Sequence, residues 1–482
     1  MATCFLVDSK ETGANSTVAG LARVRGARLM HCRGAEALPG EAARQGIVAI
    51  GASRLRQLPV YQRSQLASAV GQGATLYVRG IAPGADKLDL APFAPLDAPL
   101  APERRAVGYR FTESPMLPAA LRGEEATGGL FNSPGVECGF IPGAEELLVV
   151  RHVDGVKRAA IFALQYGGGC IIHDLNPEDE TGADAPIVAR LAAREARPLF
   201  AGALLAVNRA AGIDPECLPP FNLTIDDRPI NYDHFNTMPV SALLSHIERL
   251  CPGTHTDFAW TPRHAHPSRS YVEAMKQFSI GFAWHGLYRH VDHRVIADPA
   301  ADLARGQRTV GRIERRFGIR FQPIMIFPFE RAAPGQFPML TRAGFMASVE
   351  EPRLASCSDP YFPASPGDAR AARVDASSGF VVLHRYRAVS LTRDRMLAMA
   401  VLGLPIIALA HPEDLGLRRF SRFWDRGGDL SHFDEVLKFA SSKKMPSRSL
   451  HDIAAQVIAA EAPHATPANG AQIYATQPAG GS

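Results

Sequence analysis

The 482-residue chain has few cysteines, and no two of them form a CxxC pair. The seven stand singly, at Cys4, Cys32, Cys138, Cys170, Cys217, Cys251 and Cys357. An odd number of isolated cysteines argues against a disulfide framework and against a cysteine-type zinc site. We therefore expect reduced thiols, most of them buried.

The N-terminus lacks a secretory signal. Asp8 and Lys10 follow the first apolar residues at once, so there is no basic segment leading into an apolar run of about 7 to 15 residues. The longest apolar run, Leu199 to Val207, is far shorter than the roughly 20 residues of a membrane-spanning helix. These absences predict a cytoplasmic protein without a transmembrane segment. They leave the oligomeric state open.

The chain also lacks a large excess of charge of one sign. It has 52 basic and 48 acidic residues, which gives a net charge of +4. A chain so nearly balanced is not expected to bind nucleic acid. No GxGxxG follows the first strand-like run, so a dinucleotide site is not expected there. The glycine run at 166–170 lacks the Lys-Ser/Thr of a phosphate-binding loop and is interpreted as a hairpin turn.

What the sequence does contain is a regular alternation of short aliphatic runs and amphipathic stretches. The first 95 residues have strand-like runs at Thr3–Val7, Ala27–Cys32, Gly46–Gly51 and Ala74–Gly80, with helical patterns near Ser16–Val24 and Tyr61–Val70. This alternation is typical of βαβ units around a parallel sheet. We predict a flavodoxin-like α/β domain over 1–95, a β-rich Gly/Pro extension over 96–182, a helical linker over 183–215 broken at Pro198, and a disordered tail over 459–482.

Strand-like and helical runs alternate about seven times between Phe221 and Ile458. The strands are expected at Phe221–Ile225, Asp257–Trp260, Ile280–Trp284, Ile324–Phe327, Gly344–Val349, Gly379–Leu383 and Pro405–Ala410. Helices are expected at Ser241–Leu250, Ser270–Phe278, Pro299–Phe317, Gln336–Arg342, Arg393–Leu402 and Phe433–Ala440. Repeated βα units predict a closed or nearly closed barrel over 216–458, with an open doubly wound sheet as the alternative.

Polar residues follow most of the expected barrel strands. They are Asp226 and Asp227 after the first, His264 and His266 after the second, His285 after the third, Glu330 after the fourth, His384 after the sixth and His411 after the seventh. In a (β/α) barrel the carboxyl ends of the strands share one rim, which is where such folds carry catalysis. The sequence therefore predicts a functional rim.

The side chains on this rim favour metal-dependent hydrolysis. Adjacent carboxylates such as Asp226 and Asp227 allow one to bind a metal while the other takes a proton from water. Alone, such a pair is also typical of a turn or a helix cap. His285, His290 and His293 supply three imidazoles within nine residues. One Asp and two His form a zinc donor set with a position left open, whereas the alternative is an exposed histidine-rich loop.

The segment from Phe221 to Ile458 resembles the NodB-like polysaccharide deacetylases, a family of metal-dependent esterases and amidases on a distorted (β/α)7 barrel. Residues 224–227, Thr-Ile-Asp-Asp, match the family's Thr-Phe-Asp-Asp motif. Residues 327–330 and 340–345 resemble its substrate-lining loop and the strand start that follows. The resemblance implies that Asp226 is the general base, that Asp227, His285 and His290 hold Zn²⁺ or another divalent transition metal, and that His411 is the general acid.

Two departures from the family pattern affect these assignments. Four residues instead of three separate His285 from His290, which keeps His293 open as the second histidine ligand. The family's Arg-Pro-Pro motif, whose arginine orients the base, is replaced here by Phe-Pro-Phe-Glu. The partner of the base is therefore expected to be Arg228 or Arg331, or to be missing.

The resemblance implies an N-acetylated sugar or polysaccharide as substrate, attacked by a zinc-bound water. Trp260, Tyr288, Phe329 and Glu330 are expected to contact the sugar near the rim, since aromatic faces stack on sugar rings. Two other functions stay open. One is a catalytically inactive module for carbohydrate binding or assembly, and the other is a metal-dependent amidohydrolase acting on a small non-sugar amide.

Overall fold

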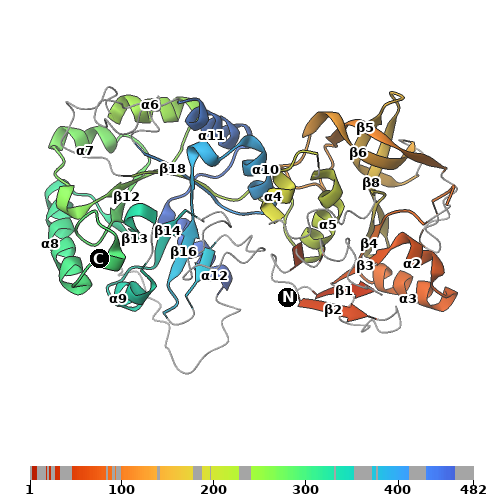
Figure 1. Ribbon diagram of the computed structural model, residues 1–482, viewed down its shortest axis with the longest axis horizontal. Helices are drawn as coiled ribbons and strands as arrows, with labels where there is room; N and C mark the ends of the chain where they lie inside the picture. The colour runs from red at the N-terminus through yellow and green to blue at the C-terminus, as the bar shows by residue number, and fades with distance from the viewer. Residues whose placement is uncertain are drawn as a thin grey trace, which may run out of the picture.

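The computed structural model describes residues 3–7, 18, 21–22, 28–32, 46–82, 85–88, 93, 99–137, 142–176, 187–195, 197–226, 240–330, 333–351, 372–375, 378–411 and 430–461. Two nine-stranded sheets organise this part of the chain. Figure 1 shows them as two bodies that meet where α4 (Ile187–Ala192) lies against α10 (Arg393–Val401). None of the helices in the described ranges combines the length and apolar character needed to cross a membrane.

The N-terminal sheet has a parallel half in the strand order β2-β1-β3-β4-β9. These strands are β1 (Thr3–Val7), β2 (Arg28–Cys32), β3 (Ile47–Gly51), β4 (Thr75–Arg79) and β9 (Gly169–Asp174). Two helices, α2 (Ala52–Gln57) and α3 (Val60–Gly71), connect β3 to β4. The strand order is that of flavodoxin-like sheets. The flavodoxin-like domain nevertheless stays a prediction, because most of the chain between β1 and β3 lies outside the described residues.

The other half of this sheet is antiparallel and extends it beyond β9. It comprises β5 (Leu100–Phe111), β6 (Glu125–Glu137), β7 (Ala144–His152) and β8 (Lys157–Tyr166). Strands β8 and β9 form the hairpin expected at the glycine run, with Tyr166 paired to Gly169. Gly167 has a φ of 58° there, in the left-handed region that favours glycine. The hairpin interpretation is therefore confirmed.

The segment expected to be a helical linker contains two helices, and the longer of them packs on the N-terminal sheet. Helix α5 (Arg197–Ala210) is buried from Arg197 to Asn208 and packs on β3, β4 and β9. The break expected at Pro198 lies between α4, which ends at Ala192, and α5, whose first turn contains Pro198, where a missing N–H costs nothing. The Ala- and Leu-rich composition that suggested a spacer is explained by burial on nearly every side. Residues 459–461 belong to the last helix, and the expected tail beyond them is not described.

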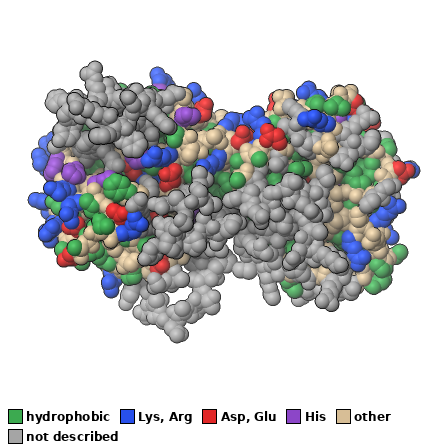
Figure 2. Space-filling model, in the orientation of Figure 1, with side chains coloured by type: hydrophobic (Ala, Val, Ile, Leu, Met, Phe, Trp, Pro, Cys, Tyr) green, Lys and Arg blue, Asp and Glu red, His purple; other side chains and the backbone are tan. Residues whose placement is uncertain are grey.

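The C-terminal sheet is barrel-like and its main strands follow chain order. They are β10 (Phe221–Ile225), β11 (Thr256–Trp260), β12 (Ile280–His285), β13 (Phe321–Ile326), β14 (Ala347–Glu350), β16 (Val381–His384), β17 (Tyr386–Arg387) and β18 (Ile406–Ala410), with β15 (Ala372–Val374) antiparallel to β16. Helices α6 (Val240–Leu250), α7 (Arg269–Met275), α8 (Pro299–Phe317), α9 (Phe337–Arg342), α10 and α11 (Ser431–Ser442) alternate with them. Figure 2 shows Lys and Arg side chains along the outer edge of this body, where Figure 1 places α8.

One short stretch of chain, residues 381–387, closes this sheet. Its first part, β16, pairs in parallel with β14, and its last part, β17, pairs in parallel with β18. The same segment therefore lies next to β15 near one end of the strand order and at the other end itself, and the sheet becomes a nearly closed barrel. The open doubly wound sheet is excluded by this pairing.

Alternate residues of each barrel strand face the interior. Phe258, Trp260 and Phe282 pack with α6 and α7, so the residues between them face the other way. The inward side chains of the middle layer are small or aliphatic, and α12 (Leu450–Glu461) packs Leu450 and Ile453 against them. This inward layer consists of Ala259, Ala283, Ile324, Ile326, Ala347, Val349, Val381, Leu383 and Ile407.

A buried carboxylate joins the two bodies. Glu124, in the N-terminal body and only 6% exposed, accepts two hydrogen bonds from Arg393 at 2.8 and 2.9 Å and one from Lys443 at 2.7 Å. Burial raises the pKa of Glu124, but the hydrogen bonds and charges of Arg393 and Lys443 outweigh it and hold the pKa below its ordinary value. A second contact, from Arg197 to Asp394 at 2.6 Å, lies beside it.

Glu124→Gln is expected to destabilise the protein by about 1–3 kcal/mol at neutral pH, because it removes these charged hydrogen bonds. A carboxyl with a lowered pKa stabilises the fold above its ordinary pKa of about 4.3, and this contribution disappears as the pH falls through the lowered value. The difference in thermal midpoint between wild type and variant should thus be full at pH 7 and shrink below about pH 4. Glu113→Gln, at a side chain 69% exposed, is the control and should change little.

Candidate functional site

Four polar side chains occupy the inward register at the carboxyl ends of the barrel strands. Asp226 follows β10, His285 ends β12, Arg385 lies between β16 and β17, and His411 follows β18. Each stands two residues beyond an inward-facing position of its strand, so period-two alternation directs all four to the barrel interior. The predicted rim therefore contains Asp226, His285 and His411, together with an arginine that was not predicted there.

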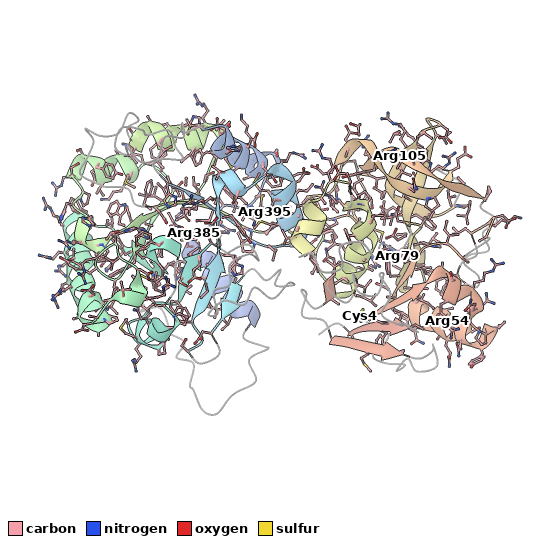
Figure 3. All side chains as sticks on the ribbon, viewed as in Figure 1. Cys4, Arg54, Arg79, Arg105, Arg385 and Arg395 are labelled. Carbon is pink, nitrogen blue, oxygen red and sulfur yellow. The ribbon has the colours of Figure 1, made fainter. Side chains whose placement is uncertain are left out.

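Asp226 and Arg385 form a fully buried ion pair. The two guanidinium nitrogens donate to the two carboxylate oxygens, Nη1 to Oδ1 at 2.8 Å and Nη2 to Oδ2 at 2.5 Å. Both side chains are at most 1% exposed. Figure 3 places Arg385 among the strands of the barrel. This bidentate geometry fixes the carboxylate in the plane of the guanidinium, which gives Asp226 a single orientation.

Arg385 is thus a partner of Asp226 that was not expected. Arg228 and Arg331, the expected partners, lie outside the described residues. The signal for Arg385 was available in the sequence. Val381, Leu383 and Arg385 share one strand face, so an arginine continues the alternation at the rim. The expected strand ended at Leu383, before the polar run His-Arg-Tyr-Arg, whereas the barrel extends it by pairing Tyr386 and Arg387 with β18.

The surroundings of Asp226 keep it ionised. Burial raises the pKa of this carboxyl, but the positive charge of Arg385, followed by His285, the Arg385 hydrogen bonds and His411, outweighs burial and lowers it. His285 and His411 are therefore near enough to act on the charge of Asp226. The site combines a buried, oriented carboxylate with two imidazoles.

The two predicted histidine ligands lie together. The ring centroids of His285 and His290 are 4.8 Å apart, with an angle of 52° between the ring planes. His285 is 2% exposed, and His290 is partly exposed. The extra residue between them, relative to the family spacing, is absorbed after β12, where Gly286 takes a φ of 85°.

His293, the alternative ligand, faces a different environment. Its Nε2 accepts a hydrogen bond from the backbone N–H of Leu287 at 3.2 Å, and its ring packs edge-on against Phe327 at 4.7 Å. Burial, as the largest cause, lowers the pKa of His293 to about 4. The structure favours His290 over His293 as the neighbour of His285, because one ring nitrogen of His293 already has a backbone partner.

The imidazoles of His285 and His290 are of a ligand type that divalent transition metals bind. Two neighbouring imidazoles and a carboxylate are the ligand types that zinc prefers in catalytic sites. Within the described ranges no three His, Cys, Asp or Glu side chains come together as a metal-binding group. The third expected ligand, Asp227, is outside those ranges, so zinc binding stays a prediction.

The expected substrate contacts fall into different places. Trp260 is 0% exposed and packs against Phe282 at 4.5 Å, so it belongs to the core between barrel and helices and is not placed to stack on a sugar. Tyr288 is partly exposed on the rim. Phe329 is 59% exposed and packs edge-on against His290 at 4.9 Å. The side chain of Glu330 is not described.

Phe329 also has an unusual backbone. Its φ of 61° lies in the left-handed region, which a bulky residue other than glycine adopts only at a cost of about 1–3 kcal/mol. This conformation presents the ring to solvent beside His290 instead of burying it. An exposed aromatic ring held at the rim is consistent with the expected contact to substrate.

The rim loop after β12 is fixed by close packing on α8. A Cβ added to Gly306 would lie 1.9 Å from the carbonyl oxygen of Leu287 and 2.9 Å from the ring of Trp284. Arg289 in the same loop donates to Asp302 of α8 at 3.0 Å. Glycine at position 306 therefore allows the helix to approach the loop that carries His290.

Gly306→Ala is expected to destabilise the protein by about 2–3 kcal/mol, because the added methyl group requires α8 and the loop to separate. Gly311→Ala in the same helix is the matched control, since the nearest atom to its added Cβ would be an Arg315 nitrogen at 3.4 Å. That control is expected to be neutral or stabilising, as alanine is the better helix former. Thermal unfolding of the two variants measures the contrast, and equal midpoints would contradict the close approach.

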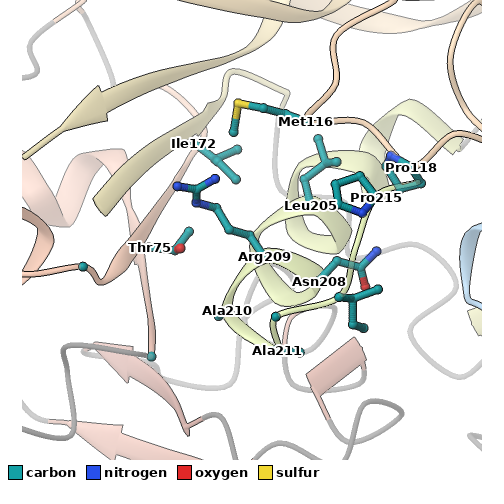
Figure 4. Close-up of a pocket in the computed structure, with 14 residues that line it drawn as sticks. Thr75, Met116, Pro118, Ile172, Leu205, Asn208, Arg209, Ala210, Ala211 and Pro215 are labelled. Carbon is teal, nitrogen blue, oxygen red and sulfur yellow. The ribbon is translucent and has the colours of Figure 1, made fainter. Parts of the chain in front are cut away.

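The N-terminal body contains a separate pocket of about 670 Å³ (Figure 4). Its lining includes Thr75 and Ile172 from the sheet, Met116, and Asn208 and Arg209 from the end of α5. It opens at the amino ends of β3 and β4, whereas parallel α/β sheets bind ligands at the carboxyl ends of their strands. The barrel rim, where the predicted chemistry converges, is therefore the better candidate site.

No family model and no curated protein matches the chain. Solved structures similar to it include a family 4 carbohydrate esterase from Streptomyces lividans, with 14% identity over 49% of this chain and 94% of that chain and a TM-score of 0.30. A peptidoglycan N-acetylglucosamine deacetylase has 14% identity over 48% and 87%, with a TM-score of 0.30. A β-galactosidase from Rahnella sp. R3 has 13% identity over 38% and 30%, with a TM-score of 0.27, so this chain spans less than a third of it. TM-scores this low do not establish a common fold. The strand pairing of the C-terminal sheet is what shows the barrel.

Proposed function

We propose that this protein is a metal-dependent hydrolase that removes the acetyl group from an N-acetylated sugar. The observation that carries the proposal is the buried Asp226–Arg385 pair next to His285 at the carboxyl end of the barrel. An ionised carboxylate beside imidazoles, in a wall of small aliphatic side chains, is an arrangement for moving protons. A structural ion pair alone would not require the histidines.

The proposed role of Asp226 is to take a proton from the attacking water. Its lowered pKa makes it a weak base, so the water must be made more acidic for the transfer to be efficient. A divalent metal held by Asp227, His285 and His290 would supply that acidification and polarise the acetyl carbonyl. Arg385 keeps the carboxylate ionised and directed into the barrel throughout.

His411 is proposed to donate a proton to the departing nitrogen of the sugar. It is partly buried, follows the last barrel strand, and lies near enough to Asp226 to lower the pKa of that carboxyl. The two groups therefore stand on neighbouring strands, one to accept the proton from water and the other to deliver a proton to the leaving amine. The products are acetate and a free amino sugar.

Acetate release from N-acetylated sugars, measured with metal content in the same preparation, tests this proposal. The wild-type protein is expected to hold about one zinc ion per chain, and His285→Ala well below half of that, with activity reduced about 1,000-fold. His255→Ala is the control, because His255 contacts Asp257 at the opposite end of the barrel. Full activity of His285→Ala, or no acetate from any acetylated sugar with zinc bound, would reject the proposed reaction.

A further inference from the structure

Helix α8 has a stripe of arginines on its exposed side. Arg305, Arg308, Arg312, Arg315 and Arg316 are all exposed, and Leu303, Val310, Ile313 and Phe317 on the other side are buried. At 100° per residue, the five arginines fall within an arc of about 100°, and they extend along about 16 Å of the helix axis. We call these five residues the arginine stripe.

In the described part of the chain, one arginine of the stripe pairs with an acid: Arg305 lies 3.7 Å from Asp302. Among the described residues, Arg308, Arg312, Arg315 and Arg316 form no ion pair. Both acidic residues of α8 have closer partners outside the stripe, since Asp302 binds Arg289 at 3.0 Å and Glu314 accepts the N–H of Phe321 at 2.9 Å. Residues 299–320 contain six arginines and two acids, an excess of four charges that equals the net charge of the whole chain, +4.

The arginine stripe is expected to destabilise α8 when no partner is bound. Like charges three and four residues apart repel one another along the helix, so the stripe weakens α8 unless something compensates. All six basic residues of the segment are arginine and none is lysine. Arginine differs from lysine in its planar fork of donors, which matches carboxylate and phosphate groups. The stripe therefore fits an anionic partner with such groups.

The stripe begins at the rim of the barrel. Helix α8 follows directly on the loop that carries His290, and Arg289 and Arg294 of that loop are 41% and 37% exposed. The close contact of Gly306 with Leu287 fixes the helix to this loop. A chain that reaches the rim and continues over the outer wall of the barrel would therefore lie along the arginines, at the edge where Figure 2 shows Lys and Arg side chains.

We infer that the arginine stripe binds an acidic glycan, by contact with its carboxylates, and that this glycan is the polymer whose acetamido group enters the rim. The inference rests on the proposed deacetylase function.

A bilayer is a poorer fit, because the apolar face of α8 is buried and unable to insert. Single-stranded nucleic acid is also a poorer fit, because α8 has no exposed aromatic side chain for base stacking. Deacetylation adds positive charge to the glycan, so the stripe favours the unreacted chain over the product.

Binding of hyaluronan to the full-length protein tests this inference, because each disaccharide of that polymer has one carboxylate and one acetamido group. The quadruple variant R308Q/R312Q/R315Q/R316Q is expected to bind it about ten- to a hundredfold more weakly than wild type at low salt. The dependence of log Kd on log salt concentration should flatten as well. The control R56Q/R110Q/R151Q/K157Q removes four charges from the N-terminal body and should stay within about twofold of wild type.

Equal hyaluronan affinity of wild type and the α8 variant would overturn the inference. So would arginine-dependent binding of phosphatidylglycerol vesicles or single-stranded DNA without binding of hyaluronan. Steady-state kinetics on two polymers distinguish a failure of this inference from a failure of the proposed function. The α8 variant should keep its kcat/KM on a neutral N-acetylated chitin oligomer and lose about tenfold or more on the acidic polymer. If neither polymer releases acetate, the proposed function fails, while the hyaluronan affinities still decide whether the stripe binds an acidic glycan.

Discussion

Replacing Asp226 with asparagine is expected to lower the rate of acetate release by about 10²- to 10⁴-fold, because asparagine has no carboxylate to accept the proton of the attacking water. The side chain keeps its size and remains inside the barrel. The buried guanidinium of Arg385 loses its counter-charge, so the variant should also be less stable by about 3–5 kcal/mol. Steady-state kinetics below the unfolding temperature, together with thermal unfolding, measure both effects.

Asp257→Asn is the matched control for this prediction. Asp257 is also fully buried and also faces the barrel interior, but at the opposite end, where it accepts hydrogen bonds from Asn222, Gln322 and the N–H of Leu450. Its replacement should reduce stability while leaving acetate release per folded molecule nearly unchanged. Equal losses of activity in both variants would mean that Asp226 acts through the fold alone, and the assignment of the base would be wrong.

The second large effect is expected at Arg385. Arg385→Met removes the partner of a buried carboxylate, which should destabilise the protein by about 3–5 kcal/mol and lower activity about 100-fold by freeing Asp226 to rotate. The double variant with Asp226→Asn should be less destabilised than the two single changes added together. A double-mutant cycle on the free energy of unfolding is expected to give a coupling of about 2–3 kcal/mol.

Arg385→Lys refines the interpretation, because lysine keeps the charge but not the paired hydrogen bonds. If Arg385→Lys is more stable than Arg385→Met but has no higher kcat, the orientation of Asp226 matters beyond its ionisation.

Arg197→Gln is the control for the substitutions of Arg385, since Arg197 is 3% exposed and paired with Asp394 away from the rim. A coupling near zero in the cycle would contradict the bidentate pair.

The barrel was predictable from the sequence because local pattern and tertiary structure agree there. The expected helix over 299–317 and the expected strand over 221–225 have the observed bounds. Glycine and charged residues mark the ends of these elements, and their apolar faces have the right periods. The packing of α5 was not predictable, because this helix is buried on nearly every side, and a helix of that kind has no amphipathic pattern to reveal what covers it.

The site was predictable in part. Asp226, His285, His290 and His411 follow apolar strands, and parallel strands bring such positions to one rim. Arg385 was missed since its strand continues through polar residues, although its alternation with Val381 and Leu383 was visible in the sequence. Trp260 was misplaced because alternation fixes a face only once the neighbouring helices are known. Side chains that depend on closure of the sheet were therefore the hardest to predict.

The seam formed by residues 381–387 has a consequence for how the protein matures. This segment completes the hydrogen bonding of both β14 and β18, and it contains the arginine that neutralises Asp226. A folding intermediate in which the first five barrel strands are assembled but the seam is open would leave Asp226 without its counter-ion. The ion pair of Asp226 and the final closure of the sheet would then form in the same step, so a partly unfolded chain would lack the oriented carboxylate on which the proposed reaction depends.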